Sequence, residues 1–259
     1  MLAHLSLLVT LWAPVRAEEL VVLVPGLGDN RRSRPCMEAL APVAAEQGYH
    51  LVVADFQRRR SVEASAEALA EYIASQQPER YERVHFVAWI LGGWALNQML
   101  AEHEVPNIAS VIYDRSPTQE RAPAAVVRLG RPFVWVMFGR LVRDLSRTPY
   151  PAWTPTGDAK VGLMIENRAT KLMVRIRRVG ESYGPLDYDE DSFGQVHDDA
   201  YYTPLDHDRI YLRHDMLWPE WSHFFAHGRF TDEAWRAPMP GEVWQEPDIE
   251  RECVLPGGG

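Results

Sequence analysis

The segment from Val84 to Leu100, VHFVAWILGGWALNQML, reads as a short buried strand, a glycine-rich turn and a helix. A turn of this kind can hold one side chain at strained backbone angles, where a hydroxyl or thiol would act as a nucleophile in acyl transfer. It needs small residues two positions before and two positions after that side chain. Ala88 and Gly92 meet this need, and Gly93 adds room. The segment therefore predicts a nucleophile elbow with Ile90 at its centre.

This segment resembles the elbow of the α/β-hydrolase superfamily of esterases and lipases. Members read roughly G-H-S-L-G-G there, and this chain reads Ala88-Trp89-Ile90-Leu91-Gly92-Gly93. The last three residues match, Ala88 is a tolerated small residue, and Trp89 and Ile90 depart from the pattern. The segment PGLGDN, residues 25–30, resembles the family's oxyanion-hole loop, which implies Leu27 and Leu91 as oxyanion-type positions. The resemblance covers residues 20–116 well and residues 200–230 loosely.

Ile90 stands where the family has its serine. Acyl transfer there requires a hydroxyl that a histidine can deprotonate, and isoleucine has none. Isoleucine is also β-branched, which makes it a poor choice for a strained turn. The alternative is that residues 84–100 form an ordinary strand–loop–helix crossover of a doubly wound protein.

The resemblance also implies a histidine on a loop just before the last helix. Residues 205–212, LDHDRIYL, have that character, with Asp-His followed by apolar residues. His207 is therefore the candidate, and His214 is its competitor. For each of them the alternative is a surface histidine in a polar loop.

Asp114 is the candidate acid, because it follows the apolar run at 108–113 and so lies at the carboxyl edge of the sheet, where open α/β folds bind ligands. Some family members carry their acid there, although the usual place is after a later strand. A helix cap or a partner for Arg115 is the alternative. Ser116 lies on the same loop and is the candidate for a displaced nucleophile, although a serine before proline is usually turn chemistry. Cys36 has no motif around it and is read as a buried structural cysteine.

Residues 187–215 are crowded with aspartate and histidine. Oxygen ligands at this density suggest calcium, but neither an EF-hand loop nor an H-E-x-x-H motif is present. We therefore predict no metal and no cofactor, and read the acidic segment as solvated.

The elements that must position these residues follow from periodicity. Apolar, β-branched runs at 20–24, 49–54, 84–88 and 108–113 predict strands, and residues 37–47, 62–77 and 94–103 predict the helices between them. This alternation predicts an α/β fold, a doubly wound and mostly parallel sheet of α/β-hydrolase type, with a helical cap and a reduced C-terminal half. Residues 160–178 have helical spacing, residues 187–215 read as a long loop or a short hairpin, and residues 218–230 predict a closing helix.

The chain divides into three parts. Residues 1–17 resemble a signal peptide cleaved after Ala17, which predicts a secreted or periplasmic protein; a cytoplasmic protein with an N-terminal extension is the alternative. Residues 18–235 form a single domain with a cap at about 119–150, including the apolar run 132–142, and residues 236–259 form a flexible tail. In an oxidising compartment Cys36 and Cys253 could pair.

The chain has 259 residues, of which 46% are hydrophobic, and a formal net charge of −9. That charge argues against nucleic acid as a partner, and no apolar run is long enough to span a membrane in the mature chain. Three functions follow, with oligomeric state left open. The first is a hydrolase-like scaffold without the serine that binds an apolar or acyl-type ligand or a partner protein. The second is an active ester hydrolase with Ser116 as nucleophile and His207 as base. The third uses His207 and Asp114 to activate water or transfer a proton directly.

Overall fold

The computed structural model describes residues 19–26, 33–57, 61–129, 141–147 and 150–257. The predicted signal peptide at 1–17, the oxyanion-type position Leu27 and most of the apolar run at 132–142 lie outside these ranges.

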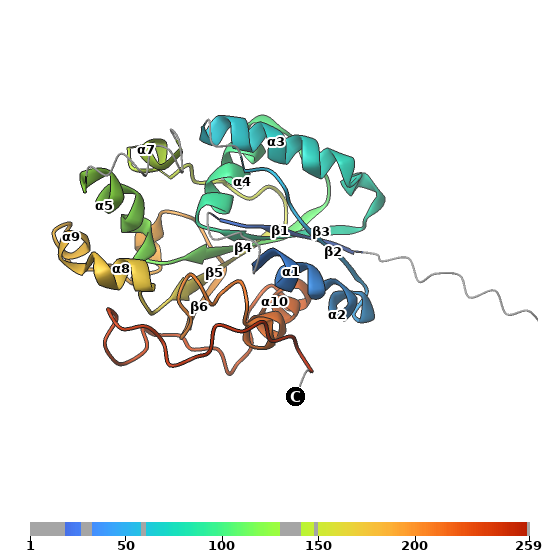
Figure 1. The fold of residues 1–259 in the computed structure, drawn as a ribbon. Helices are drawn as coiled ribbons and strands as arrows, with labels where there is room; N and C mark the ends of the chain where they lie inside the picture. Colours follow the sequence, from blue (N-terminus) through green and yellow to red (C-terminus); the bar gives the residue numbers. More distant parts are fainter. Residues whose placement is uncertain (1–18, 27–32, 58–60, 130–140, 148–149, 258–259) are drawn as a thin grey trace, which may run out of the picture.

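A six-stranded sheet in the order β2-β1-β3-β4-β5-β6 forms the centre of the molecule, and every neighbouring pair is parallel (Figure 1). The strands are β1 (Glu19–Val24), β2 (Tyr49–Val53), β3 (Arg83–Trp89), β4 (Ile108–Arg115), β5 (Lys160–Glu166) and β6 (Asp199–Thr203). Their apolar runs are buried on both faces, as in parallel sheets covered by helices. This confirms the predicted fold class.

Helices cover both faces of this sheet (Figure 1). On one side lie α3 (Val62–Ser75) and α4 (Leu91–Glu102), and on the other α1 (Ser33–Ala39), α2 (Ala41–Glu46) and α10 (His214–His227). Two apolar clusters correspond to the two layers, one around Phe86 and Leu96 and the other around Trp89 and Trp221. No helix in the described ranges has both the length and the apolar character needed to cross a bilayer.

The strand order reverses between β1 and β3. The chain moves outward from β1 to β2 and then returns to the other side of β1 to form β3. Helices therefore leave the carboxyl ends of these neighbouring strands toward opposite faces, which opens a crevice there. The turn containing Ile90 follows β3 at this point.

The prediction of one helical segment over residues 160–178 is wrong. Lys160–Glu166 form strand β5, and only then follow the short helices α8 (Lys171–Arg175) and α9 (Arg177–Glu181). Residues 161–165 are buried between β4 and β6, so sheet pairing outweighs the helical spacing. The prediction of a loop or hairpin over 187–215 also missed β6, which pairs in parallel with β5.

The remaining described elements are short: η1 (Pro78–Arg80), η2 (Gln119–Arg121), α5 (Ala122–Arg128), α7 (Leu141–Leu145) and η3 (Asp191–Phe193).

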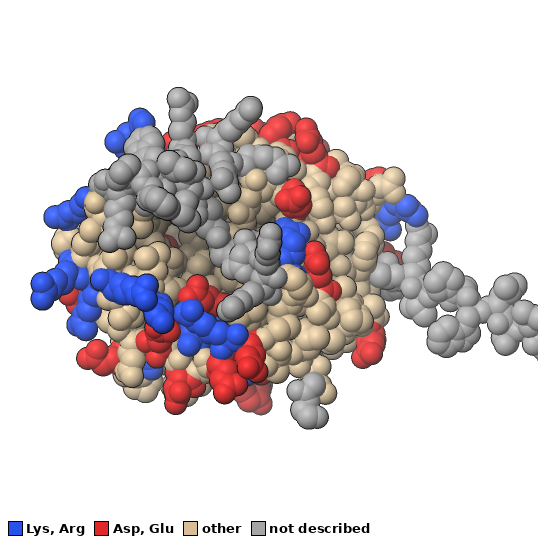
Figure 2. Space-filling model, viewed as in Figure 1, with Lys and Arg blue, Asp and Glu red and all other residues tan. Residues whose placement is uncertain are grey.

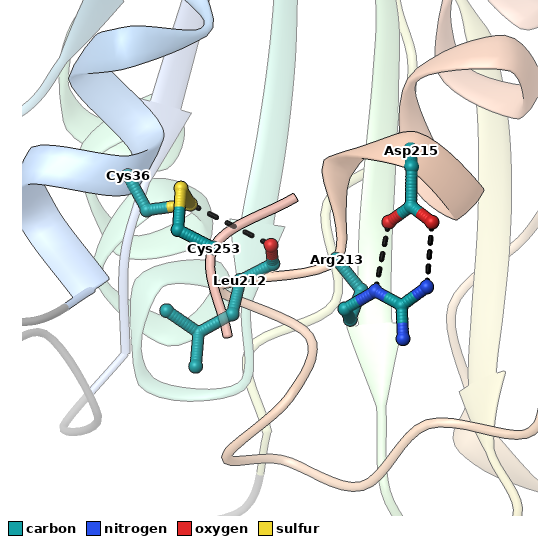
Figure 3. Close-up of a disulfide and its surroundings, with 5 residues drawn as sticks. All are labelled: Cys36, Leu212, Arg213, Asp215 and Cys253. Carbon is teal, nitrogen blue, oxygen red and sulfur yellow. Dashed lines mark hydrogen bonds and ion pairs between the residues drawn. A yellow bond between two sulfur atoms is a disulfide. The ribbon is translucent and has the colours of Figure 1, made fainter. Parts of the chain in front are cut away.

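The C-terminal segment, expected to be a flexible tail, lies against the domain. The N–H of Met239 donates to Asn167, and the guanidinium of Arg251 pairs with Asp208 at 2.6 Å. Near its end, Cys253 forms a disulfide with Cys36 of α1, with Cα atoms 5.6 Å apart (Figure 3). The structure thus contains the disulfide that the sequence left open.

The residue after this disulfide pairs with the segment that leads into α10. The N–H of Val254 donates to the carbonyl of Leu212 at 2.9 Å, and the carbonyl of Val254 accepts from the N–H of Asp215 at 3.0 Å. Arg213 and Asp215 form a two-pronged ion pair beside it, at 2.8 and 2.6 Å (Figure 3). The end of the chain therefore holds the loop that carries His207.

Candidate active site

Ile90 sits in the turn between β3 and α4 with φ +20° and ψ −83°. Residues other than glycine rarely adopt this backbone conformation, and for a β-branched residue it is strained. The helix begins at the next residue, Leu91. The backbone of residue 90 therefore has the strained geometry expected of an elbow, although its side chain cannot act as a nucleophile.

Gly92 explains how strand and helix approach so closely. A Cβ atom at this position would lie 1.9 Å from the carbonyl oxygen of Val24, at the end of β1. Only glycine fits without moving one of the two backbones. At Gly93 a Cβ would lie 2.8 Å from the hydroxyl of Tyr150, which is the tip of a side chain.

His207 lies beside two carboxyl groups from neighbouring strands. Its Nδ1 is 2.7 Å from Glu166, the last residue of β5, and 3.4 Å from Asp114 in β4. Both carboxyl side chains are fully buried, and the His207 side chain is 9% exposed. The structure thus places the predicted His207 and Asp114 together, with Glu166 as the nearer acid.

The ionisable groups of this cluster shift one another's pKa values. Burial disfavours a charged His207, but the Glu166 carboxyl, together with Asp114, raises its pKa to about 10. Burial, and then the charge of Asp114, raises the pKa of Glu166 well above its usual value. Both oxygens of Asp114 and Oε2 of Glu166 are buried and make no hydrogen bond within the described residues. The Glu166 carboxylate and the His207 imidazolium stabilise each other as a buried pair.

The same three residues could hold a divalent ion. Each offers one ligand atom, and these atoms all lie within 4.8 Å of one another. Two carboxylates and one imidazole are a suitable donor set for a transition metal. An ion bound there would have to replace the hydrogen bond between His207 and Glu166.

Tyr211 occupies the other side of the imidazole. Its hydroxyl is 3.2 Å from Nε2 of His207 and accepts a hydrogen bond from the N–H of Gly26 at 3.1 Å. Its ring packs against Trp89, with ring centroids 5.1 Å apart. Tyr211 is only 1% exposed.

Two adjoining cavities open over the turn. The first has a volume of about 220 Å³ and is mostly apolar, and the second, of about 240 Å³, has a more polar wall. Ile90, Pro123 and Leu145 line both. The first is completed by Leu91, Gln119, Ala122, Val126, Val142, Leu172, His207 and Asp208. The cap helices α5 and α7 thus cover a small apolar cavity that Ile90 lines from the other side.

The remaining candidates lie in different surroundings. Ser116 is fully buried, and its hydroxyl lies 3.2 Å from that of Thr118 and accepts from the N–H of Gln119 at 3.2 Å, which is a local turn. Cys36 is in the disulfide. His214 begins α10, buried against Trp221. Burial lowers its pKa to about 4.

The acidic segment uses its carboxylates locally. Asp198 accepts from the N–H of Val161 and pairs with Lys160, and Asp206 pairs with Arg209 at 2.6 Å. On the face drawn in Figure 2, basic side chains gather over α8 and α9, with acidic side chains next to them. Neither sign covers that face alone.

The sequence alone did not identify two residues of the site, Glu166 and Tyr211. Glu166 could have been found if the run VGLMIE had been read as a strand, because its last residue then falls on the ligand-binding edge. Tyr211 gave no such signal, since its contact with Gly26 joins residues 185 positions apart.

No protein-family model matches the chain, and no curated protein matches it. Among solved structures it is similar to a mature lipase of Bacillus licheniformis, with 14% identity and a TM-score of 0.46 over 68% of this chain and 76% of that one. It is similar to an esterase of Pyrococcus furiosus, with 13% identity and a TM-score of 0.45 over 83% and 81%. An α/β-hydrolase enzyme from a lagoon-sediment metagenome matches with 11% identity and a TM-score of 0.43 over 82% and 86%. Similarity at this level says nothing about the activity of this chain.

Proposed function

We propose that this chain is an α/β-hydrolase-like protein that has lost serine-based ester hydrolysis and binds a small apolar or acyl-type ligand above Ile90. One observation carries the proposal: an isoleucine occupies the strained turn beside His207 and forms part of the wall of both cavities. A strained residue persists where the surrounding structure holds it in place. The strained backbone of the elbow is therefore present at Ile90, while the nucleophilic side chain is not.

The state of His207 supports the loss of catalysis. A general base works best when its pKa is near the working pH, so that it is partly unprotonated. The Glu166 and Asp114 carboxyl groups raise the pKa of His207 to about 10, which favours the imidazolium. An imidazolium lacks the lone pair that would accept a proton from a hydroxyl or from water.

The first cavity supports an apolar ligand. Its wall is built mainly from aliphatic side chains, and Leu172 at its rim is 48% exposed. At about 220 Å³ it is smaller than the roughly 300–1,000 Å³ typical of pockets for drug-sized ligands, which suits a short acyl chain.

Ligand binding can be tested with a fluorescent fatty-acid probe and short-chain competitors. Val126→Trp would fill the first cavity and is expected to weaken binding at least about ten-fold, the effect of losing about 1.4 kcal/mol of contact. Val196→Trp is the matched control, because Val196 is 70% exposed and is not part of the cavity wall. Equal binding by both variants would count against this ligand site.

Catalysis is tested by labelling with a serine-directed fluorophosphonate. We expect no labelling of the native chain. Labelling that disappears in Ser116→Ala would support the alternative, an ester hydrolase with Ser116 as the nucleophile and His207 as base. The turn that holds the Ser116 hydroxyl argues against this alternative.

The Cys36–Cys253 disulfide supports an exported protein, since such bonds persist in oxidising compartments. Cleavage after Ala17 would appear in the mass of the native protein. An intact Met1 would contradict it.

A further inference from the structure

His207 has both ring nitrogens engaged. Nδ1 faces Glu166 at 2.7 Å, and Nε2 faces the hydroxyl of Tyr211 at 3.2 Å. In hydroxyl-based acyl transfer the acid holds Nδ1 while Nε2 takes the proton of the nucleophile. Here Nε2 is the nitrogen left for that role, and the tyrosine hydroxyl already occupies its hydrogen-bonding direction.

The tyrosine is fixed from several sides. The N–H of Gly26 donates to its hydroxyl, and a Cβ on Gly26 would lie 2.7 Å from that oxygen, so glycine permits the approach. Its ring packs against Trp89. His207 and Tyr211 also lie four residues apart in one turn, where Asp206 accepts from the N–H groups of Arg209 and Ile210.

We propose that Tyr211 is a positioning residue that takes the hydrogen bond of His207 which a nucleophile would need, so that catalysis at this site is blocked at Tyr211 as well as at Ile90. This deepens the proposed function and rests on it. If a serine were restored at position 90 alone, Nε2 of His207 would still be hydrogen-bonded to the Tyr211 hydroxyl and not to the serine.

Tyr211 is not itself placed to attack a ligand. It is 1% exposed and does not line either of the two cavities over Ile90. Its oxygen accepts from the N–H of Gly26 and, when His207 is protonated, from Nε2–H, so its lone pairs face donors inside the protein.

The experiment compares three chains: Ile90→Ser, Ile90→Ser with Tyr211→Phe, and Ile90→Ser with Tyr202→Phe. Phenylalanine keeps the ring and removes only the hydroxyl. Tyr202→Phe is the control, because the Tyr202 hydroxyl donates to the Tyr188 carbonyl and makes no contact with His207. We expect Tyr211→Phe to speed fluorophosphonate labelling about ten- to a hundred-fold, the effect of one hydrogen bond to a charged group. The control is expected to match Ile90→Ser. Equal, rapid labelling of all three chains would overturn the role of Tyr211 while showing that the elbow is in register.

A second measurement covers the case in which none of the three is labelled. The pKa of His207 can be followed by NMR in the Ile90 chain with and without Tyr211→Phe. The Tyr211 hydroxyl accepts from Nε2–H of the protonated imidazole, so its loss should lower the pKa of His207. We expect a decrease of about one pKa unit or more, and each unit corresponds to about 1.4 kcal/mol. An unchanged pKa would overturn the proposal. A lowered pKa without labelling would uphold Tyr211 and place the fault in the elbow alignment. Labelling of the native chain at Ser116 would instead contradict the proposed function alone.

Discussion

At the scale of single residues, Asp114, Glu166 and His207 form a coupled cluster buried in the domain. The two carboxyl groups raise the pKa of His207, and burial and the charge of Asp114 raise the pKa of Glu166. A cluster of this kind tolerates changes that leave one carboxyl group beside the imidazole and resists changes that remove both.

This predicts strong non-additivity in stability. Glu166→Gln and Asp114→Asn each replace a carboxyl that the other can compensate for, so each should lower the free energy of unfolding by about 1 kcal/mol. The double variant leaves the imidazolium without a counter-charge, and should lose about 2 kcal/mol more than the sum. Urea unfolding of all four chains measures the coupling. Simple additivity would mean that neither carboxyl group compensates for the loss of the other.

His214 predicts a dependence of stability on pH. Its pKa is about 4 in the folded chain, against 6.5 as the ordinary value. Between these values the unfolded chain binds a proton and the folded chain does not, so stability falls as pH falls from 6.5 toward 4. The full effect is about 3 kcal/mol. His214→Leu should flatten this acid limb in thermal melts, and His227→Leu, at an exposed histidine of the same helix, should not. Parallel acid limbs in the native and His214→Leu chains would rule out this role.

The candidate site was predictable as far as position along the sheet determines it. The sequence places Ile90, Asp114 and His207 at this edge because each follows a recognisable strand or precedes the last helix. Glu166 was missed because its strand was missed. Tyr211 was missed because its partners are chosen by tertiary packing, which no local pattern records.

At the scale of elements, the turn between β3 and α4 stores strain at Ile90. The close contact of Gly92 with Val24 fixes the start of the helix, and the chain must then bend at residue 90. The strain thus comes from packing of β1 against α4 and does not depend on a nucleophile.

A matched pair of substitutions measures this strain. Ile90→Gly and Ile90→Ala remove nearly the same side chain, but only glycine adopts the turn freely. We expect the glycine chain to be more stable than the alanine chain by about 1–3 kcal/mol in chemical unfolding. In an unstrained position alanine would instead be the more stable by roughly 0.5–1 kcal/mol. That outcome would show that residue 90 is not strained.

The strands differ in how much of them the sequence determines. The runs at 20–24, 49–54, 84–88 and 108–113 are mostly apolar, and their ends lie within two residues of the ends of β1 to β4. Strand β5 is followed by a basic helical segment, so its apolar run was read as part of one helix over residues 160–178. Strand β6, DAYYT, has no aliphatic run, and its burial depends on its pairing with β5 and on the packing of Tyr201 against Phe230.

At the scale of the whole molecule, the disulfide joins the first helix to the end of the chain across 217 positions. In the chain-entropy account, a closed loop of this length stabilises the fold by about 5 kcal/mol. The bond also holds Val254 in its pairing with Leu212 and Asp215, close to the turn that contains His207 and Tyr211.

Reduction should therefore loosen this part of the molecule first. We expect faster hydrogen exchange at the amides of Val254 and Asp215 in reduced protein, or in Cys253→Ser, while β1 and β3 stay protected. Thermal unfolding should occur at a lower temperature in both. Unchanged exchange at Asp215 would show that the tail stays in place without the bond.

The sulfur bridge also gives the protein a covalent ring. Almost the whole domain lies between the two cysteines, so a protease that cuts one exposed loop there cannot separate the two pieces. A molecule nicked once in this way would remain one covalently linked molecule without a reducing agent and separate into two fragments with one.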